Sequence, residues 1–282
     1  MTIFAGLLTA AVAIDPGGYI GRYYIDNHNN GPFFQQTNPD LSEGDHFIDL
    51  GAFGANTGFG FHVDASGNVT GITPSVAATA VGASLTFANA NVTVDPNGLT
   101  GAYFITPYTH DPFTDLHTFV LVPGIEYVVD DGAFIGGSAF GFTVLDATGQ
   151  VVAVTSAAAT GVGSTLQLNP VAFTIDPGGY TGDYGVSPFG ETLFHGLNHF
   201  ALMPLLAYAL DDSAFVGGSG FPFQVPAGGG TLRLPNVVIT VDPLGGYAGN
   251  YAISTNGPFS GISPVVVITG LVTNLRIGDA AA

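Results

Sequence analysis

The stretch IDPGGY occupies residues 14–19 and recurs letter for letter at residues 175–180. Related turns, VDPNGL and VDPLGGY, occupy residues 94–99 and 241–247. In such a turn the proline fixes one φ angle, glycine accepts a positive φ, and the aspartate side chain can accept hydrogen bonds from backbone N–H groups. A β-branched residue stands directly before the aspartate in every copy. We therefore interpret each copy as the end of a strand followed by a hairpin turn. The turn-forming aspartates are Asp15, Asp95, Asp176 and Asp242.

Similarity between the copies extends well beyond the turns, whose aspartates are spaced by 80, 81 and 66 residues. After the second turn comes TFVLVPGIEYVVDDGAFIGGSAFGFTV (118–144), after the third comes HFALMPLLAYALDDSAFVGGSGFPFQV (199–225), and the first copy has a looser match at 46–63. Such internal similarity predicts a tandem array of about three and a half repeats. The expected limits are 1–82, 83–163, 164–230 for a shortened repeat, and 231–282 for a partial repeat.

Within each repeat the residue pattern is typical of strands. The segments ANVTV (90–94) and VAFTI (171–175) are short and rich in β-branched residues, and each runs into a turn. A second hairpin is expected around Asp146–Gly149, and no segment has sustained helical periodicity. We therefore predict an all-β fold, in which hairpin-rich repeats of about 80 residues form serial small β-sandwich or barrel-like units.

The N-terminal residues 1–13, MTIFAGLLTAAVA, align with segments that precede the later turns. They contain no basic residue, whereas a secretory signal peptide begins with a positively charged region. We interpret them as the opening strands of the first repeat. We therefore expect no recognisable N-terminal signal peptide, and the alternative is that this segment is a cleaved signal.

The charge balance is unusual. The chain of 282 residues has 3 Lys and Arg residues against 21 Asp and Glu residues, and charged residues make up 9% of it. Few carboxylates can therefore pair with a cationic side chain, and much of the surface is left to apolar or small polar groups. Because large exposed apolar patches mark interfaces, we expect a subunit of an assembly. The alternative is an ordinary β-protein with a surface of glycine and small polar residues.

The composition also excludes several classes of partner. A chain with a net charge of −18 and no basic patch repels phosphate backbones, so we expect no nucleic-acid partner. The absence of cysteine excludes disulfides and thiolate metal sites. The best candidate for a transmembrane helix, residues 200–210, is interrupted by Pro204 and is shorter than the about 20 residues required. An acidic, cysteine-free, glycine-rich chain suits export, so we expect an extracellular or cell-surface location.

Recurring acidic residues are the best candidates for a binding site. Asp130 and Asp131 match Asp211 and Asp212, and the first repeat keeps Asp49. Loops of aspartate and carbonyl oxygens are what Ca²⁺ prefers, and bound calcium would offset the uncompensated negative charge. Adjacent strand residues point to opposite faces, so a pair binds one ion only where the backbone turns. We expect either a calcium site or turn capping alone.

The remaining polar residues provide no catalytic set. His195 and His199 share a face, and His110 lies near His117, but a transition-metal site needs three or four convergent ligands. We interpret them as surface loop histidines. The chain has no G-x-S-x-G nucleophile motif, no lysine for a phosphate-binding loop, and no tryptophan to stack on a sugar. We therefore expect that the protein is not an enzyme and has no certain cofactor.

These features together predict a structural protein. Tandem β units, few charges and an array that stops partway through a fourth unit leave strand edges and an apolar face for other subunits to cover. Head-to-tail docking of such subunits gives fibres when the geometry does not close. We expect a homopolymer of this chain outside the cell, as a filament, tube, sheath or surface layer. The alternative is a surface adhesin or glycan-binding repeat module.

Overall fold

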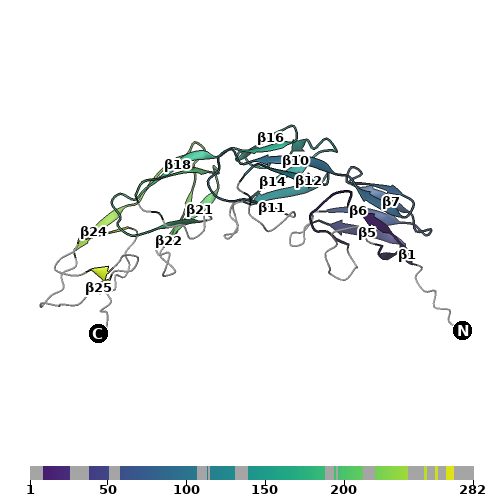
Figure 1. The fold of residues 1–282 in the computed structure, drawn as a ribbon, viewed down its shortest axis with the longest axis horizontal. Helices are drawn as coiled ribbons and strands as arrows, with labels where there is room; N and C mark the ends of the chain where they lie inside the picture. Colours follow the sequence, from purple (N-terminus) through teal and green to yellow (C-terminus); the bar gives the residue numbers. More distant parts are fainter. Residues whose placement is uncertain are drawn as a thin grey trace. The chain divides into compact units, whose positions relative to one another are not determined.

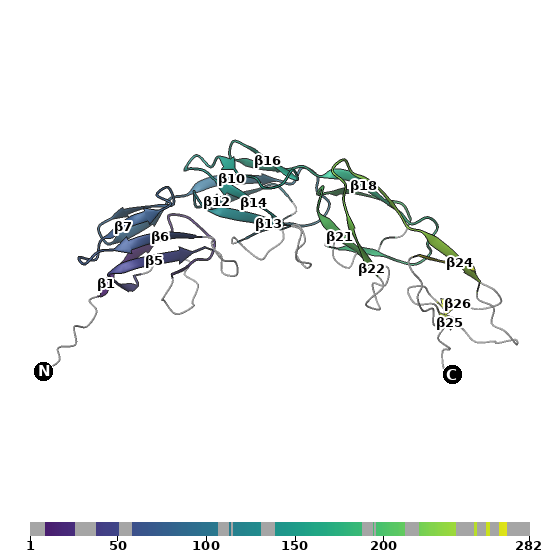
Figure 2. The same ribbon diagram turned by 180° about the vertical axis from the view of Figure 1, so that it is seen from behind.

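The computed structural model is built entirely of short strands and the turns between them. It describes residues 9–25, 38–50, 58–106, 113, 115–130, 139–187, 194, 196–211 and 220–240, and the backbone of 251–252, 258–259 and 265–269. These residues contain no helix, and their strands form several small sheets (Figures 1 and 2). The prediction of an all-β fold is confirmed.

The chain divides into two compact units. The first comprises Met1–Asn97, Tyr103–Asp131 and Ala139–Asn169, and the second comprises Gly98–Ala102, Gly132–Ser138 and Pro170–Ala282. Strand pairing further groups the described residues into modules. We refer to residues 9–87 as the first module, 90–168 as the second and 171–234 as the third.

The first module contains two principal sheets. One has the order β2 (Ala13–Asp15), β9 (Ser84–Phe87), β8 (Ala78–Val81). The short strand β1 (Thr9–Ala11), which precedes β2 in the chain, pairs with β4 (Asp40–Ser42). The other has the order β3 (Tyr24–Ile25), β5 (Gly44–Asp49), β6 (Gly58–Val63), β7 (Val69–Thr73). Phe59 of β6 packs edge to face on Phe87 of β9, with 5.3 Å between ring centroids. The two sheets therefore share one core.

The second module has the same two-layer build (Figure 1). One sheet has the order β12 (His117–Leu121), β10 (Ala90–Asp95), β17 (Thr165–Leu168), β16 (Ala159–Val162). The other has the order β11 (Phe104–Thr106), β13 (Glu126–Asp130), β14 (Ala139–Val144), β15 (Val151–Val152). Buried and more exposed side chains alternate along β10, as expected for a strand with one face on the core. Val92 and Val94 are fully buried, whereas Asn91, just before Val92, is exposed. The hairpin expected at Asp146–Gly149 joins β14 to β15 and is confirmed.

The third module is a shortened version. Its sheets have the orders β20 (Asn198–Leu202), β18 (Val171–Asp176), β23 (Gly230–Arg233), and β19 (Gly185–Ser187), β21 (Ala207–Asp211), β22 (Gly220–Gln224). Phe173 of β18 stacks on Phe223 of β22 at 5.4 Å, which joins the two sheets. A single turn, in which Gly229 N–H donates to Pro226 O, connects β22 to β23. That turn replaces the extra hairpins of the other modules.

Residues beyond the third module are described only in part. β24 (Asn236–Thr240) pairs with β27 (Val265–Thr269), and β25 (Tyr251–Ala252) pairs with β26 (Pro258–Phe259). The predicted repeat arrangement, including the partial fourth repeat, therefore stays a prediction.

The strand before each Asp-Pro turn has a recurring set of partners. β10 is antiparallel to β12 and parallel to β17, β18 is antiparallel to β20 and parallel to β23, and β2 is parallel to β9. The parallel partner comes from the end of the same module. The expected limits after residues 82 and 163 fall in the tight turns of the β8–β9 and β16–β17 hairpins. Strand pairing places both hairpins in the same module as the residues that precede them. The sequence could not indicate this, because a parallel partner that is distant in the chain leaves no local sequence pattern.

The three Asp-Pro turns that the structure describes, at Asp15, Asp95 and Asp176, do not form hairpins. β10 leads into the turn at Asp95 and pairs with β12 and β17, whereas β11, which follows the turn, pairs with β13 in the other sheet. The same separation holds for β2 and β3, and for β18 and β19. The hairpin interpretation is therefore wrong, because each turn carries the chain from one sheet of its module to the other. Tight turns of both kinds use the same residues, so the sequence could not distinguish them.

Candidate assembly surface

One edge of the two-layer modules is bridged internally. In the first module Val69 N–H of β7 donates to Gly82 O, directly after β8, at 2.8 Å. In the second, Val151 N–H of β15 donates to Gly163 O, directly after β16, at 2.8 Å. On the opposite side, the sheets that contain β1, β10 and β18 end at β4, β12 and β20, which we call the outer strands. Backbone hydrogen bonds from Tyr103 to Phe113 and from Tyr184 to Phe194 connect the residues just before β11 and β19 to segments that precede β12 and β20. Unpaired backbone groups on such an edge can bind another part of a chain.

A tyrosine hydroxyl caps the end of two outer strands. Val122, directly after β12, donates its N–H to the Tyr127 hydroxyl at 2.8 Å and accepts the hydroxyl proton at its carbonyl at 3.2 Å. Met203, directly after β20, donates its N–H to the Tyr208 hydroxyl at 3.0 Å. Both tyrosines are buried, so these backbone groups are satisfied away from water.

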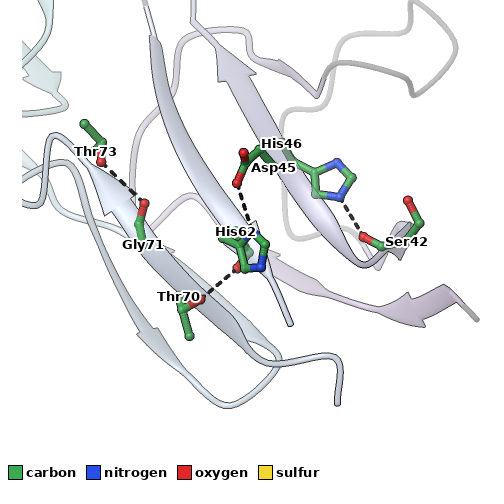
Figure 3. A network of polar contacts seen from close by, with 7 residues as sticks. All are labelled: Ser42, Asp45, His46, His62, Thr70, Gly71 and Thr73. Atoms are coloured by element: carbon green, nitrogen blue, oxygen red, sulfur yellow. Dashed lines mark hydrogen bonds and ion pairs between the residues drawn. The ribbon is translucent and has the colours of Figure 1, made fainter. Parts of the chain in front are cut away.

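In the first module a histidine takes the place of this tyrosine. His46 lies three residues before Asp49 at the end of β5, as Tyr127 lies three residues before Asp130 at the end of β13. His46 is buried, and its Nε2–H donates to the carbonyl of Ser42, the last residue of β4, at 2.9 Å. Figure 3 shows the imidazole pointing toward Ser42.

Thr100, which follows the Asp-Pro turn of the second module, binds the outer strand of the third. Its N–H donates to Ala201 O at 2.9 Å, and Ala201 N–H donates to Thr100 Oγ1 at 3.1 Å. Ala201 stands opposite Ala172 in the β18–β20 pair, and both of its backbone groups are used by Thr100. We call these two hydrogen bonds the turn clasp. Residues 98–102 accordingly belong to the second compact unit, together with β20.

The outer strand of the first module has the equivalent position at Asp40. Asp40 stands opposite Ala11 of β1, and the neighbouring Val12 N–H donates to Pro39 O at 2.9 Å. In an antiparallel pair, hydrogen-bonded and non-hydrogen-bonded positions alternate. The N–H and C=O of Asp40 therefore point away from β1, toward the side of β4 on which no described strand pairs. The side chain of Asp40 is also exposed.

A hydrogen-bonded histidine–aspartate pair lies close to this outer strand on the second sheet. Asp45 and His62 stand opposite each other on β5 and β6, and His62 Nδ1 lies 2.8 Å from Asp45 Oδ1. Figure 3 shows the two side chains pointing toward each other, with Thr70 donating its hydroxyl to the His62 carbonyl. The Asp45 side chain is 95% exposed, so this pair contributes little to stability.

The turn-forming aspartates accept the N–H of the residue two positions further on. The N···Oδ1 distances are 2.9, 2.8 and 2.9 Å at Asp15, Asp95 and Asp176. In the first module Tyr19 N–H also donates to Pro16 O at 2.9 Å, and Gly17–Gly18 between them have φ values of 61° and 108°. Two central residues with positive φ explain why this turn needs glycine. Asp242 lies outside the described residues.

The aspartates considered as calcium ligands occupy equivalent strand ends in separate sheets. Asp49 ends β5, Asp130 ends β13 and Asp211 ends β21. Asp131 and Asp212 lie outside the described residues. Within the described part of the chain, no three His, Cys, Asp or Glu side chains are grouped closely enough to hold a metal ion. The calcium hypothesis stays a prediction.

Two of the histidines considered as metal ligands can be located. His199 is exposed on β20, and its Nδ1 lies 2.9 Å from Thr174 Oγ1 on the neighbouring β18. His117 begins β12 and packs on Phe113, with 4.7 Å between ring centroids. His110 and His195 lie outside the described residues.

Two buried tyrosines, which follow the Asp-Pro turns of the second and third modules, bind the segments just before the outer strands β12 and β20. Burial raises the pKa of Tyr103, with a smaller contribution from the nearby carboxylates, and its hydroxyl donates to the Asp115 carbonyl at 3.2 Å. Burial also raises the pKa of Tyr184, whose hydroxyl donates to the Gly196 carbonyl at 3.1 Å. Both groups therefore stay protonated and act as donors to the segment before β12 or β20.

Sequence reasoning did not single out Thr100, Tyr127 or Tyr208. The shared spacing of the two tyrosines from the aspartates at the strand ends was an available signal. Nothing comparable marked Thr100, because its partner Ala201 contributes only backbone atoms.

Comparison with known proteins gives no family. No protein-family model matches the chain, and no curated protein matches it. Among the described residues, no helix is long and apolar enough to cross a membrane, as expected from the sequence.

Proposed function

We propose that this chain is a structural protein that assembles with copies of itself outside the cell, into a filament, tube, sheath or surface layer. The turn clasp carries the proposal. Thr100, in the turn segment 98–102, bonds to Ala201 on the outer strand β20 of the same compact unit, so a short turn segment suffices to cover a strand edge. A contact of this kind within one chain can equally join two chains.

Recurring exposed apolar side chains support the same proposal. Val81 ends β8 and is 81% exposed, and Val162 ends β16 and is 59% exposed. Leu116 and Leu197, just before β12 and β20, are also exposed. Apolar side chains that recur at equivalent surface positions favour contact with further protein.

The proposal is tested with the purified full chain, by sedimentation velocity and negative-stain electron microscopy over a concentration series. We expect the mean mass to rise with concentration and the micrographs to contain ordered polymers or layers. The double variant Val81→Thr and Val162→Thr keeps the shape and strand preference of both side chains but removes their apolar contribution. It should assemble more weakly than the wild type. A single monomeric species at every concentration would overturn the proposal.

A further inference from the structure

We propose that β4 of one chain binds the turn segment at Thr181 of a second copy, through the same two hydrogen bonds that Thr100 makes with Ala201. This inference rests on the proposed function and names the surfaces involved. It follows from strand register, from the direction of backbone groups, and from the chemistry of the residues after the turns.

Register makes Asp40 the counterpart of Ala201. On β4, Leu41 stands opposite Ala10, which lies five residues before Asp15. On β20, Leu202 stands opposite Val171, which lies five residues before Asp176. The residue before each leucine therefore occupies the same place on its outer strand.

The direction of the backbone groups makes Asp40 the residue of β4 that can hydrogen-bond to a second copy. Its N–H and C=O point away from β1, as derived from the hydrogen bond between Val12 and Pro39. The other outward position, Ser42, already receives a hydrogen bond from buried His46 at its carbonyl. A contact centred on one residue therefore suits this edge better than the addition of a whole strand.

Chemistry selects Thr181 as the partner. The residues in the position of Thr100 after the other turns are Ile20, Thr181 and Ala248. Of these three residues only Thr181 supplies both the N–H and the hydroxyl oxygen that the clasp uses, and the hydroxyl of Thr100 is already engaged with Ala201. Thr181 follows the turn of the third module and is exposed.

The resulting contact joins different surfaces of the two copies. The turn of the third module in one copy binds the outer strand of the first module in the next. A heterologous contact of this kind leaves a free turn at one end and a free outer strand at the other, and it gives an open polymer.

The test is a double-mutant cycle on assembly of the full chain. Thr181→Val removes the hydroxyl acceptor and keeps the side-chain shape, and Asp40→Pro removes the N–H donor at an edge position that tolerates proline. Each should raise the concentration needed for half-assembly by about threefold to tenfold, as expected for loss of one hydrogen bond. Because both remove the same hydrogen bond, the double variant should be no weaker than the weaker single variant. Thr181→Ser and Asp40→Asn are the matched controls, because both keep the hydrogen-bonding groups of the contact. Thr181→Ser should assemble like the wild type, and Asp40→Asn, which also removes a negative charge, should assemble no more weakly than the wild type.

A photo-crosslinking residue at position 181 identifies the occupant directly. We expect crosslinks to residues 40–42 of a second copy, detected by mass spectrometry of the crosslinked dimer. Crosslinks only to residues 265–269 of the same chain, or additive effects in the cycle, would overturn this inference while polymers of the wild type would still support self-assembly. A wild type that never assembles would instead overturn the proposed function.

Discussion

At the scale of single residues, in the first and third modules the Asp-Pro turn contacts an asparagine that follows the last strand of the module, at the junction to the next part of the chain. In the first module Asn89 Nδ2 donates to Pro16 O at 3.0 Å, and a Cβ atom at Gly17 would lie only 2.8 Å from that Nδ2. In the third module Asn236 donates to Pro177 O at 2.9 Å, again beside a glycine.

The second module replaces both members of this pair. Asn97, with a φ of 48°, takes the place of Gly17, and Pro170 takes the place of Asn89. The turn glycine and the junction asparagine therefore occur together and change together. The asparagine side chain needs the space that only glycine leaves.

This match predicts different costs for two alanine substitutions at positive φ. Gly17→Ala introduces a Cβ atom 2.7 Å from Phe87 O, whereas Gly163→Ala, at a similar φ of 57°, meets no atom within 4 Å. We expect Gly163→Ala to lower the free energy of unfolding by about 1 kcal/mol through backbone strain alone. Gly17→Ala should cost about 1–3 kcal/mol more through overpacking. Urea unfolding of both variants measures the difference, and equal costs would contradict the steric explanation.

Turn aspartates also predict a pH dependence of stability. Hydrogen bonds from the Thr148 hydroxyl and N–H hold the pKa of Asp146 below its ordinary value. A lowered folded-state pKa gives stability that is present above the unfolded-state pKa, about 3.9, and is lost as pH falls through the folded-state value. The loss in unfolding free energy caused by Asp146→Ala should therefore be larger at pH 7 than at pH 3, as measured by urea unfolding. Thr148→Val removes one donor and should reduce this pH dependence, whereas a pH-independent loss would contradict the assignment.

At the scale of strands, the tyrosine caps carry a prediction about the outer edge. Tyr208→Phe removes the hydroxyl that accepts Met203 N–H and leaves that buried donor without its partner. We expect a loss of about 1–3 kcal/mol in the free energy of unfolding. Hydrogen exchange of the Met203 amide should accelerate more than that of Leu210 in the neighbouring β21. Tyr24→Phe, at a half-buried position on β3, provides a comparison and should cost less.

Strand ends were predictable from the sequence, whereas strand partners were not. The Asp-Pro turns end β2, β10 and β18 because proline and two positive φ values exclude further pairing. Whether the chain then returns to the same sheet depends on contacts made by distant residues. The hairpins predicted at the Asp-Pro turns were therefore wrong, whereas the hairpin predicted at Asp146–Gly149 was confirmed. The turn clasp could not be predicted from the sequence either, because Ala201 takes part through backbone atoms alone.

At the scale of the whole molecule, the excess of acidic residues opposes association. The net charge of −18 is shared by every copy, and Asp40 brings one exposed carboxylate to the outer strand β4. Copies that dock must bring these charges closer together, so assembly should depend on how far the charges are neutralised or screened.

Assembly should therefore strengthen as pH falls from 7 toward 5 and when a divalent cation is added at pH 7. Protonation removes negative charge as pH approaches the ordinary carboxyl pKa of about 4, and divalent cations neutralise carboxylates directly. Light scattering of the full chain measures both effects, and a chelator or a return to pH 7 should reverse them. Sodium chloride at matched ionic strength separates general screening from cation binding, and Asp40→Asn should weaken the response to pH if this carboxylate lies at the contact. Scattering that is indifferent to pH, divalent cations and salt would contradict the view that repulsion between carboxylates limits assembly.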